Sequence, residues 1–162
     1  MLVDTLFNEL KDKIVIFDFD GVLTTYRSTD DTVHTKTVEY IEHHASGYAK
    51  AWASTRALKT MQELIEKLNK NKVYVLSEAM TSFEMKNKDE FIRSNYDSII
   101  PGHVMYVGQR TFKLILLEYL FNSGRFGIIP KSNIVVIEDN IQTISELEDA
   151  GFSCYHISSF VE

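Results

Sequence analysis

The sequence contains four short runs rich in Val, Ile and Phe or other strand-forming residues, and their repetition restricts the folds open to the chain. The first run, KIVIFDF at residues 13–19, is closely followed by a glycine, as is typical of a buried strand in a parallel sheet. Similar runs recur at three places: 73–76, 134–137 and 153–157. A further strand is expected at 103–107, after the Pro101-Gly102 turn.

Helical patterns lie between these runs. Apolar residues recur at spacings of three and four in three segments, which predicts amphipathic helices. The three stripes are Leu58, Met61, Leu64, Ile65 and Leu68; Phe112, Ile115, Leu116, Tyr119 and Leu120; and Ile141, Ile144 and Leu147. The last stripe ends at Gly151, a natural left-handed helix terminator. The alternation predicts an α/β fold, with a Rossmann-like parallel sheet and helices on both of its faces.

The chain of 162 residues is expected to form a single domain over residues 1–162. Residues 26–55 mix polar turns with short helical stretches. We interpret them as a short flap or very small cap, inserted after the first strand.

Composition narrows the classes of partner. A formal net charge of -6 argues against a nucleic-acid polymer, because proteins that bind one usually carry a basic patch. The N-terminal segment lacks the features of a signal peptide, and no apolar run is long enough to cross a bilayer, so no membrane partner is expected. The single cysteine, Cys154, cannot form an internal disulfide, which favours a cytoplasmic location.

Two aspartates two positions apart end the first run, in the string VIFDFDGVLTT. Residues i and i+2 of a strand share a face, so Asp18 and Asp20 can both point into the crevice where open α/β sheets place ligands. One carboxylate could attack phosphorus while the other transfers protons. The alternative, that Asp20-Gly21 merely forms a turn, leaves Asp18 unexplained, since a buried unpaired charge is costly. A metal ion would explain it.

A second acidic pair, Glu138 and Asp139, ends the run NIVVI and directly precedes a helix. Taken alone, Asp139 or Asn140 would be interpreted as a helix N-cap. Two strands that both end in carboxylates favour a bound divalent cation instead, and Mg²⁺ prefers one or two carboxylates plus substrate phosphate. Without a cation, like charges about 4 Å apart repel by roughly 4 kcal/mol at an effective dielectric of about 20.

Ser77 and a lysine are candidates for contacting phosphate. Ser77 follows the run VYVL and could donate a hydrogen bond to a phosphoryl oxygen. Lys113 stands in the first turn of a predicted helix, where its charge opposes the helix dipole, and this conflict favours a functional role. Lys86 and Lys88 are rivals for the same task, but their KNKDE setting indicates a solvated helix face.

These elements, in this order, resemble the haloacid dehalogenase-like (HAD) superfamily of phosphatases. The string DFDGVLT at residues 18–24 is similar to the first motif of that superfamily, and VIEDN followed by a helix ending in AG is similar to its fourth. Ser77 and Lys113 match the second and third motifs by position. The resemblance extends from Ile14 to Gly151.

The resemblance implies a role for each acidic residue. Asp18 would be the nucleophile and a magnesium ligand. Asp20 would be the general acid and base, and its backbone carbonyl would also bind the metal. Asp139 would complete the metal site, with Glu138 directly behind these ligands.

The resemblance also implies that Ser77, Lys113 and Gly21 would hold the phosphoryl group. It places the strand at 14–18 between those at 73–76 and 134–137, which would make the two acidic strand ends neighbours. No proline follows Lys113, unlike in many members. The short insertion resembles capless or minimally capped members.

The expected function is therefore Mg²⁺-dependent hydrolysis of a small phosphorylated metabolite through a phospho-aspartate. A nucleotide is a candidate substrate, because LSEAM followed by KNKDEF resembles the deoxyribonucleotidases. Two alternatives stay open. One is a phosphomutase, which normally needs a larger cap, and the other is a catalytically idle domain that binds a partner protein. An oligomer, in which a neighbouring subunit closes the site, is also left open.

Overall fold

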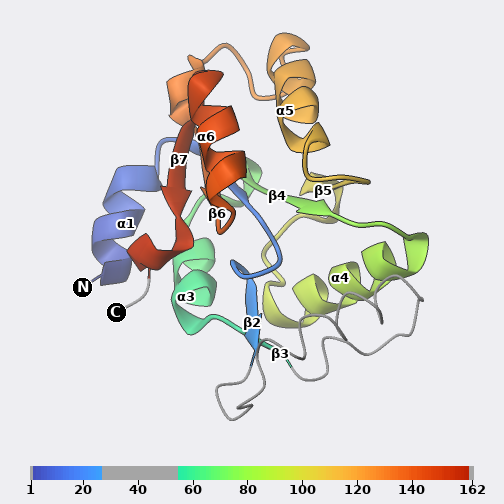
Figure 1. Ribbon diagram of the computed structural model, residues 1–162. Coiled ribbons are helices and arrows are strands. Elements are labelled where there is room, and N and C mark those ends of the chain that lie inside the picture. The colour runs from blue at the N-terminus through green and yellow to red at the C-terminus, as the bar shows by residue number, and fades with distance from the viewer. Residues whose placement is uncertain (1, 27–54, 161–162) are drawn as a thin grey trace.

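The computed structural model describes residues 2–26 and 55–160 (Figure 1). Its helices are α1 (Leu2–Leu10), α3 (Lys59–Lys67), α4 (Ser82–Asn95), α5 (Phe112–Asn122) and α6 (Ile141–Asp149). Its strands are β1 (Ile14–Phe17), β2 (Thr24–Tyr26), β3 (Thr55–Ala57), β4 (Val73–Glu78), β5 (Val104–Val107), β6 (Ile134–Glu138) and β7 (Ser153–His156). Short 3₁₀ turns lie between several of these elements.

Five of the strands form a parallel sheet in the order β5-β4-β1-β6-β7. The predicted α/β fold with a parallel sheet is confirmed, as is the central place of the first strand between β4 and β6. In the register of the sheet, Phe17 pairs with Val75 of β4 and with Ile137 of β6. The residues that follow Phe17 and Ile137, which are Asp18 and Glu138, therefore lie side by side at the end of the sheet.

Helices cover both faces of this sheet, as predicted, and each face has its own apolar core. Alternate residues of β1 divide between them: Val15 and Phe17 pack on the side of α1, α3 and α4, whereas Ile14 and Ile16 pack on the side of α5 and α6. All four residues of β1 are buried. Two covered faces explain why this strand is a continuous apolar run rather than an alternating one.

The first strand ends at Phe17, one residue before the end of the strand expected at 14–18 and two before the end of the run at 13–19. The N–H of Asp18 still donates to the carbonyl of Ile137 at 2.9 Å, so one more residue remains tied to β6. The chain then turns through Gly21, whose φ of 75° lies in the left-handed region that favours glycine. The i, i+2 relation of a strand therefore does not govern Asp18 and Asp20.

A two-stranded antiparallel ribbon, β2 and β3, pairs Tyr26 with Thr55. The two end residues of the predicted flap or small cap are thus neighbours. Residues 27–54, which make up the rest of it, lie outside the described residues. Within residues 2–26 and 55–160, no helix has both the length and the apolar character needed to cross a membrane.

One hydrogen bond ties the turn after β1 to the far end of α4. The hydroxyl of Tyr96, the residue that caps α4, donates to the carbonyl of Leu23, and both residues are buried. We predict that Tyr96→Phe lowers the free energy of unfolding by about 1 kcal/mol, because it removes one hydrogen bond from a buried carbonyl and leaves only the longer one from the N–H of Leu58 at 3.4 Å. Denaturant unfolding measures the loss.

Tyr119→Phe is the matched control, since Tyr119 is 68% exposed. It should change stability by no more than about 0.5 kcal/mol. Equal stability of the two variants would show that the Tyr96 hydroxyl does not anchor this turn.

Candidate active site

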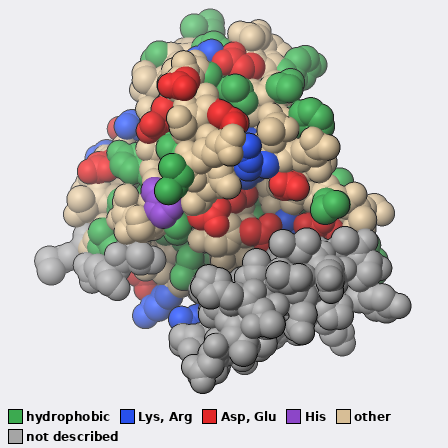
Figure 2. Space-filling view, viewed as in Figure 1, with side chains coloured by type: hydrophobic (Ala, Val, Ile, Leu, Met, Phe, Trp, Pro, Cys, Tyr) green, Lys and Arg blue, Asp and Glu red, His purple; other side chains and the backbone are tan. Residues whose placement is uncertain are grey.

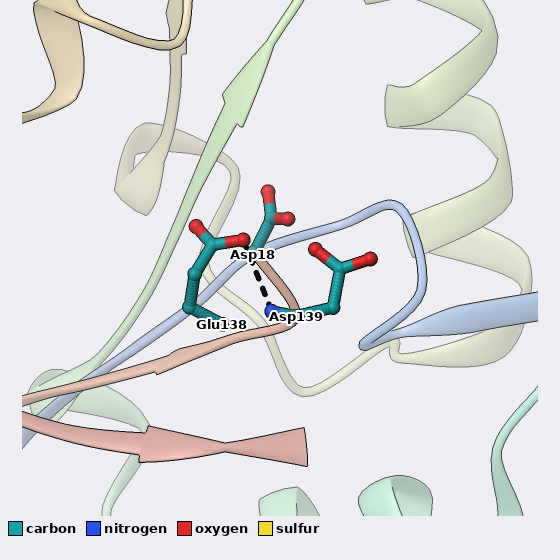
Figure 3. Close-up of side chains that lie close together, drawn as sticks. All are labelled: Asp18, Glu138 and Asp139. Atoms are coloured by element: carbon teal, nitrogen blue, oxygen red, sulfur yellow. Dashed lines mark hydrogen bonds between the residues drawn. The ribbon is translucent and has the colours of Figure 1, made fainter. Parts of the chain in front are cut away.

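Three acidic residues converge where β1 and β6 end at the carboxyl edge of the sheet. Asp18 follows β1 directly, Glu138 is the last residue of β6, and Asp139 comes next. Each offers a carboxylate oxygen, and these oxygens all lie within 4.8 Å of one another. Figure 3 shows the three side chains pointing toward the same space. The parallel register of β1 and β6 thus brings together the two acidic strand ends that the sequence predicts to be neighbours.

Glu138 is buried, and hydrogen bonds occupy both of its carboxylate oxygens. Oε1 accepts the backbone N–H groups of Asp139 at 3.0 Å and Asn140 at 3.1 Å, and Figure 3 draws the first of these. Oε2 accepts from Nζ of Lys113 at 2.7 Å. Glu138 therefore shapes the turn that carries Asp139, and it has little remaining capacity to bind another group.

The next residue, Asn140, is the N-cap of α6. Its side-chain oxygen accepts the N–H of Thr143 at 2.9 Å, which satisfies one of the donors that a helix start leaves unpaired. This arrangement resolves the alternative left open between Asp139 and Asn140. Asn140 serves as the cap, and the Asp139 carboxylate lies beside Asp18 and against Gly21.

Lys113 lies in the first turn of α5, as its sequence position indicates, and is buried. Its Nζ donates to Oδ1 of Asp18 at 2.8 Å as well as to Glu138. Burial alone would lower the pKa of Lys113, but the two carboxylates outweigh it and raise the pKa above its ordinary value. The lysine is therefore charged, and its ion pairs outweigh its unfavourable place near a helix N-terminus.

Lys88 is also buried in the site, so the interpretation of its surroundings as a solvated helix face is wrong for this residue. Its exposed fraction is 0%, whereas Lys86 on the same helix is exposed. Nζ of Lys88 donates to Oδ2 of Asp20 at 2.8 Å and to Oγ of Ser77 at 2.9 Å. Sequence reasoning set this lysine aside because two of the three buried residues of α4, Glu84 and Lys88, are charged, and only Ile92 is apolar. Their spacing of four was the available signal.

The site contains more negative than positive charge. The carboxylates are those of Asp18, Asp20, Glu84, Glu138 and Asp139, and the ammonium groups are those of Lys88 and Lys113. Burial raises the pKa of Asp18 to about 7; Lys113 opposes this rise, and Glu138 and Asp20 add to it. Desolvation also raises the pKa of Asp139. Acidic side chains gather near the middle of the face seen in Figure 2.

Comparison with known proteins gives a likeness in structure alone. No family model matches the sequence, and no curated protein matches it either. A crystal structure of a HAD family enzyme from Bacteroides thetaiotaomicron, a magnesium complex, superposes with a TM-score of 0.52 at 14% identity, covering 90% of this chain and 93% of that one. The fold is HAD-like.

A second structure is the HAD domain of the effector protein Lem4 from Legionella pneumophila. Its TM-score is 0.48 at 10% identity, and the match covers 90% of this chain and 84% of that one.

The donor set of this site fits a small hard cation. Oδ1 of Asp18 accepts from Lys113, and within residues 2–26 and 55–160 no other hydrogen bond to the Asp18 carboxylate is formed. Asp139 is exposed and close to it. Oxygen ligands with net negative charge are what Mg²⁺ prefers, whereas the Glu138 oxygens are already occupied. Asp18 and Asp139 are therefore the carboxylates available to a metal.

Gly21 allows the turn after β1 to approach Asp139 closely. A Cβ at this position would lie 2.3 Å from Oδ2 of Asp139, well inside contact distance, and the φ of 75° would itself be strained. We predict that Gly21→Ala displaces the Asp139 carboxylate and weakens Mg²⁺ binding, measured by calorimetry without substrate. Gly124→Ala is the control, because Gly124 also has positive φ but has open space around it. Equal Mg²⁺ affinity in the two variants would contradict the prediction.

Proposed function

We propose that this protein is a Mg²⁺-dependent phosphomonoesterase that acts through a phospho-aspartate at Asp18 on a small phosphorylated metabolite, with a nucleotide as a candidate. The observation that supports this most is the position of Asp18. It is a buried carboxylate at the end of a central parallel strand, next to Asp139 and held by Lys113. An acid in this position has no evident structural purpose, because burying it is costly.

Asp18 and Asp139 would hold the magnesium ion through their side chains, and Asp20 through its backbone carbonyl. When bound, the ion offsets the negative charge of the site and of the phosphoryl oxygens. The excess of carboxylates over lysines supports this requirement.

Two residues of the chain would perform the chemistry. An oxygen of Asp18 attacks phosphorus, a new O–P bond forms, and the ester P–O bond breaks. Asp20 gives its proton to the departing alkoxide. Asp20 then takes a proton from the water that attacks the phospho-aspartate, which releases inorganic phosphate and restores Asp18.

Lys113 is better suited than its rivals to contact the phosphoryl group. An ammonium has three N–H donors, and within the described part of the chain Lys113 uses two of them, on Asp18 and Glu138. The third can serve a phosphoryl oxygen. Ser77 donates its hydroxyl proton to the Glu78 carbonyl at 3.1 Å, so this proton must turn before it can reach a phosphate.

The metal requirement separates the roles of Glu138 and Asp139, the two acids at the end of β6. Asp139→Asn should raise the Mg²⁺ concentration needed for half-maximal activity more than Glu138→Gln does, because Asp139 is proposed to touch the ion and Glu138 is not. Asp149→Asn, an exposed acid at the other end of α6, should leave it unchanged. Calorimetric titration with Mg²⁺ checks the same order without turnover. The reverse order would exchange the two roles, and full activity in excess chelator would refute the metal requirement.

The role of Asp20 can be tested with two leaving groups. p-Nitrophenolate leaves without help from an acid, so Asp20→Asn should form the phospho-enzyme from p-nitrophenyl phosphate and hydrolyse it slowly. Rapid mixing should then show a burst near one equivalent of nitrophenol per site. An alkyl phosphate should give no burst, because its first step has lost the acid.

Asp18→Asn is the matched control and should abolish both the burst and the slow phase. Burst-free turnover of the nitrophenyl ester by Asp20→Asn, together with unchanged turnover of the alkyl ester, would remove Asp20 from the mechanism.

A further inference from the structure

Lys88 has more partners than a charge that merely stabilises the fold would need. Besides Asp20 and Ser77, its Nζ donates to the backbone carbonyl of Glu78 at 2.7 Å and lies 3.2 Å from Oε1 of Glu84. It also lies 5.1 Å from the ring centre of Phe19, within the range of a cation–π contact. Both of the predicted site residues that it touches, Asp20 and Ser77, belong to elements other than its own.

The number of donors rules out direct binding of phosphate by Lys88 in this arrangement. An ammonium has three N–H groups, and acceptors at 2.7, 2.8 and 2.9 Å occupy all three. Lys113, in contrast, uses two of its three donors within the described residues. The two buried lysines therefore have different tasks.

The position of Lys88 is itself closely determined. Glu84, one turn earlier in α4, pairs with Lys88 through Oε1 and accepts the N–H of Met80 at 2.8 Å through Oε2. Thr81 caps the helix by accepting the N–H of Glu84 at 3.1 Å. The turn between β4 and α4 thus holds the ammonium group in one place.

We propose that Lys88 is the positioning residue for Asp20. It acts by holding Oδ2, which orients the carboxyl group toward the leaving oxygen and later toward the attacking water. This inference depends on the proposed function, because it assigns to Asp20 the proton transfers described above. Asp20 needs such an anchor, since its side chain is 43% exposed and lies in a turn beyond the end of β1. The hydrogen bond from Lys88 restricts the orientations open to this carboxyl group, and proton transfer depends on such positioning.

A double-mutant cycle tests the proposal. Lys88→Met should lower turnover of an alkyl phosphate by about a hundredfold, the typical contribution of a general acid, and should produce a burst with p-nitrophenyl phosphate. In the Asp20→Asn background, Lys88→Met should change neither rate by more than about twofold, because the group through which it acts is already lost. Lys86→Met, on the exposed face of the same helix, should behave as wild type.

Three results would overturn the proposal. If the fold-losses in rate caused by Lys88→Met and Asp20→Asn multiply in the double variant, Lys88 acts independently of Asp20. If Lys88→Met loses turnover equally with both substrates and shows no burst, Lys88 serves phosphate binding. If Lys88→Met has wild-type rates, Lys88 has no role in the reaction. Lys88→Gln, which keeps a side-chain donor, is used in the cycle if Lys88→Met does not fold.

Melting temperatures separate this proposal from the proposed function. Wild-type protein that is inactive on every phosphate ester would refute the function. In that case the ion pair between Lys88 and Asp20 can still be tested through stability. Asp20→Asn should lower the melting temperature when it is introduced into the wild-type protein. It should not lower the melting temperature when it is introduced into Lys88→Met, because the charged partner of Asp20 is already absent there. Equal shifts in the two backgrounds would refute the anchoring of Asp20 by Lys88.

Discussion

Repulsion between carboxylates at the ends of two adjacent parallel strands is the constraint on which the rest of this site depends. The register of β1 with β6 places Asp18 beside Glu138, and the turn at Gly21 brings the next loop against Asp139. At about 4 Å and an effective dielectric of about 20, each pair of like charges costs roughly 4 kcal/mol. Such an arrangement is stable only with nearby cations, and the fold supplies two of them as buried lysines.

The two lysines reach the site from opposite faces of the sheet. Lys88 belongs to α4, which packs with α1 and α3 against one face, and Lys113 belongs to α5, which packs with α6 against the other. Each ammonium group pairs with one of the two aspartates of the first motif: Lys88 with Asp20, and Lys113 with Asp18. This separation gives the two aspartates different surroundings, as the different roles proposed for them require.

The helices that carry these groups are themselves held in place around the site. Arg110, in the turn before α5, donates to Oγ1 of Thr143 at 3.0 Å and pairs with Glu146 at 3.2 Å, both on α6. Thr143 in turn contacts the cap residue Asn140. Because Lys113 and Asp139 lie next to these anchors, the distance between the lysine and the acids depends on a network outside the site.

The sequence by itself determined the sheet, the helices on both faces and the two acidic strand ends, because hydrophobic periodicity and residue type are local properties. It also placed Lys113, whose conflict with the helix dipole is visible in the chain. Only the tertiary structure decided that Lys88 is buried on Asp20 and Ser77, and that Glu138 is occupied by two backbone N–H groups and Lys113. The spacing of four in α4 shows only that Glu84, Lys88 and Ile92 share a face. It does not show that this face is buried, because a charged side chain is stable inside the protein only when segments distant in sequence supply its partners.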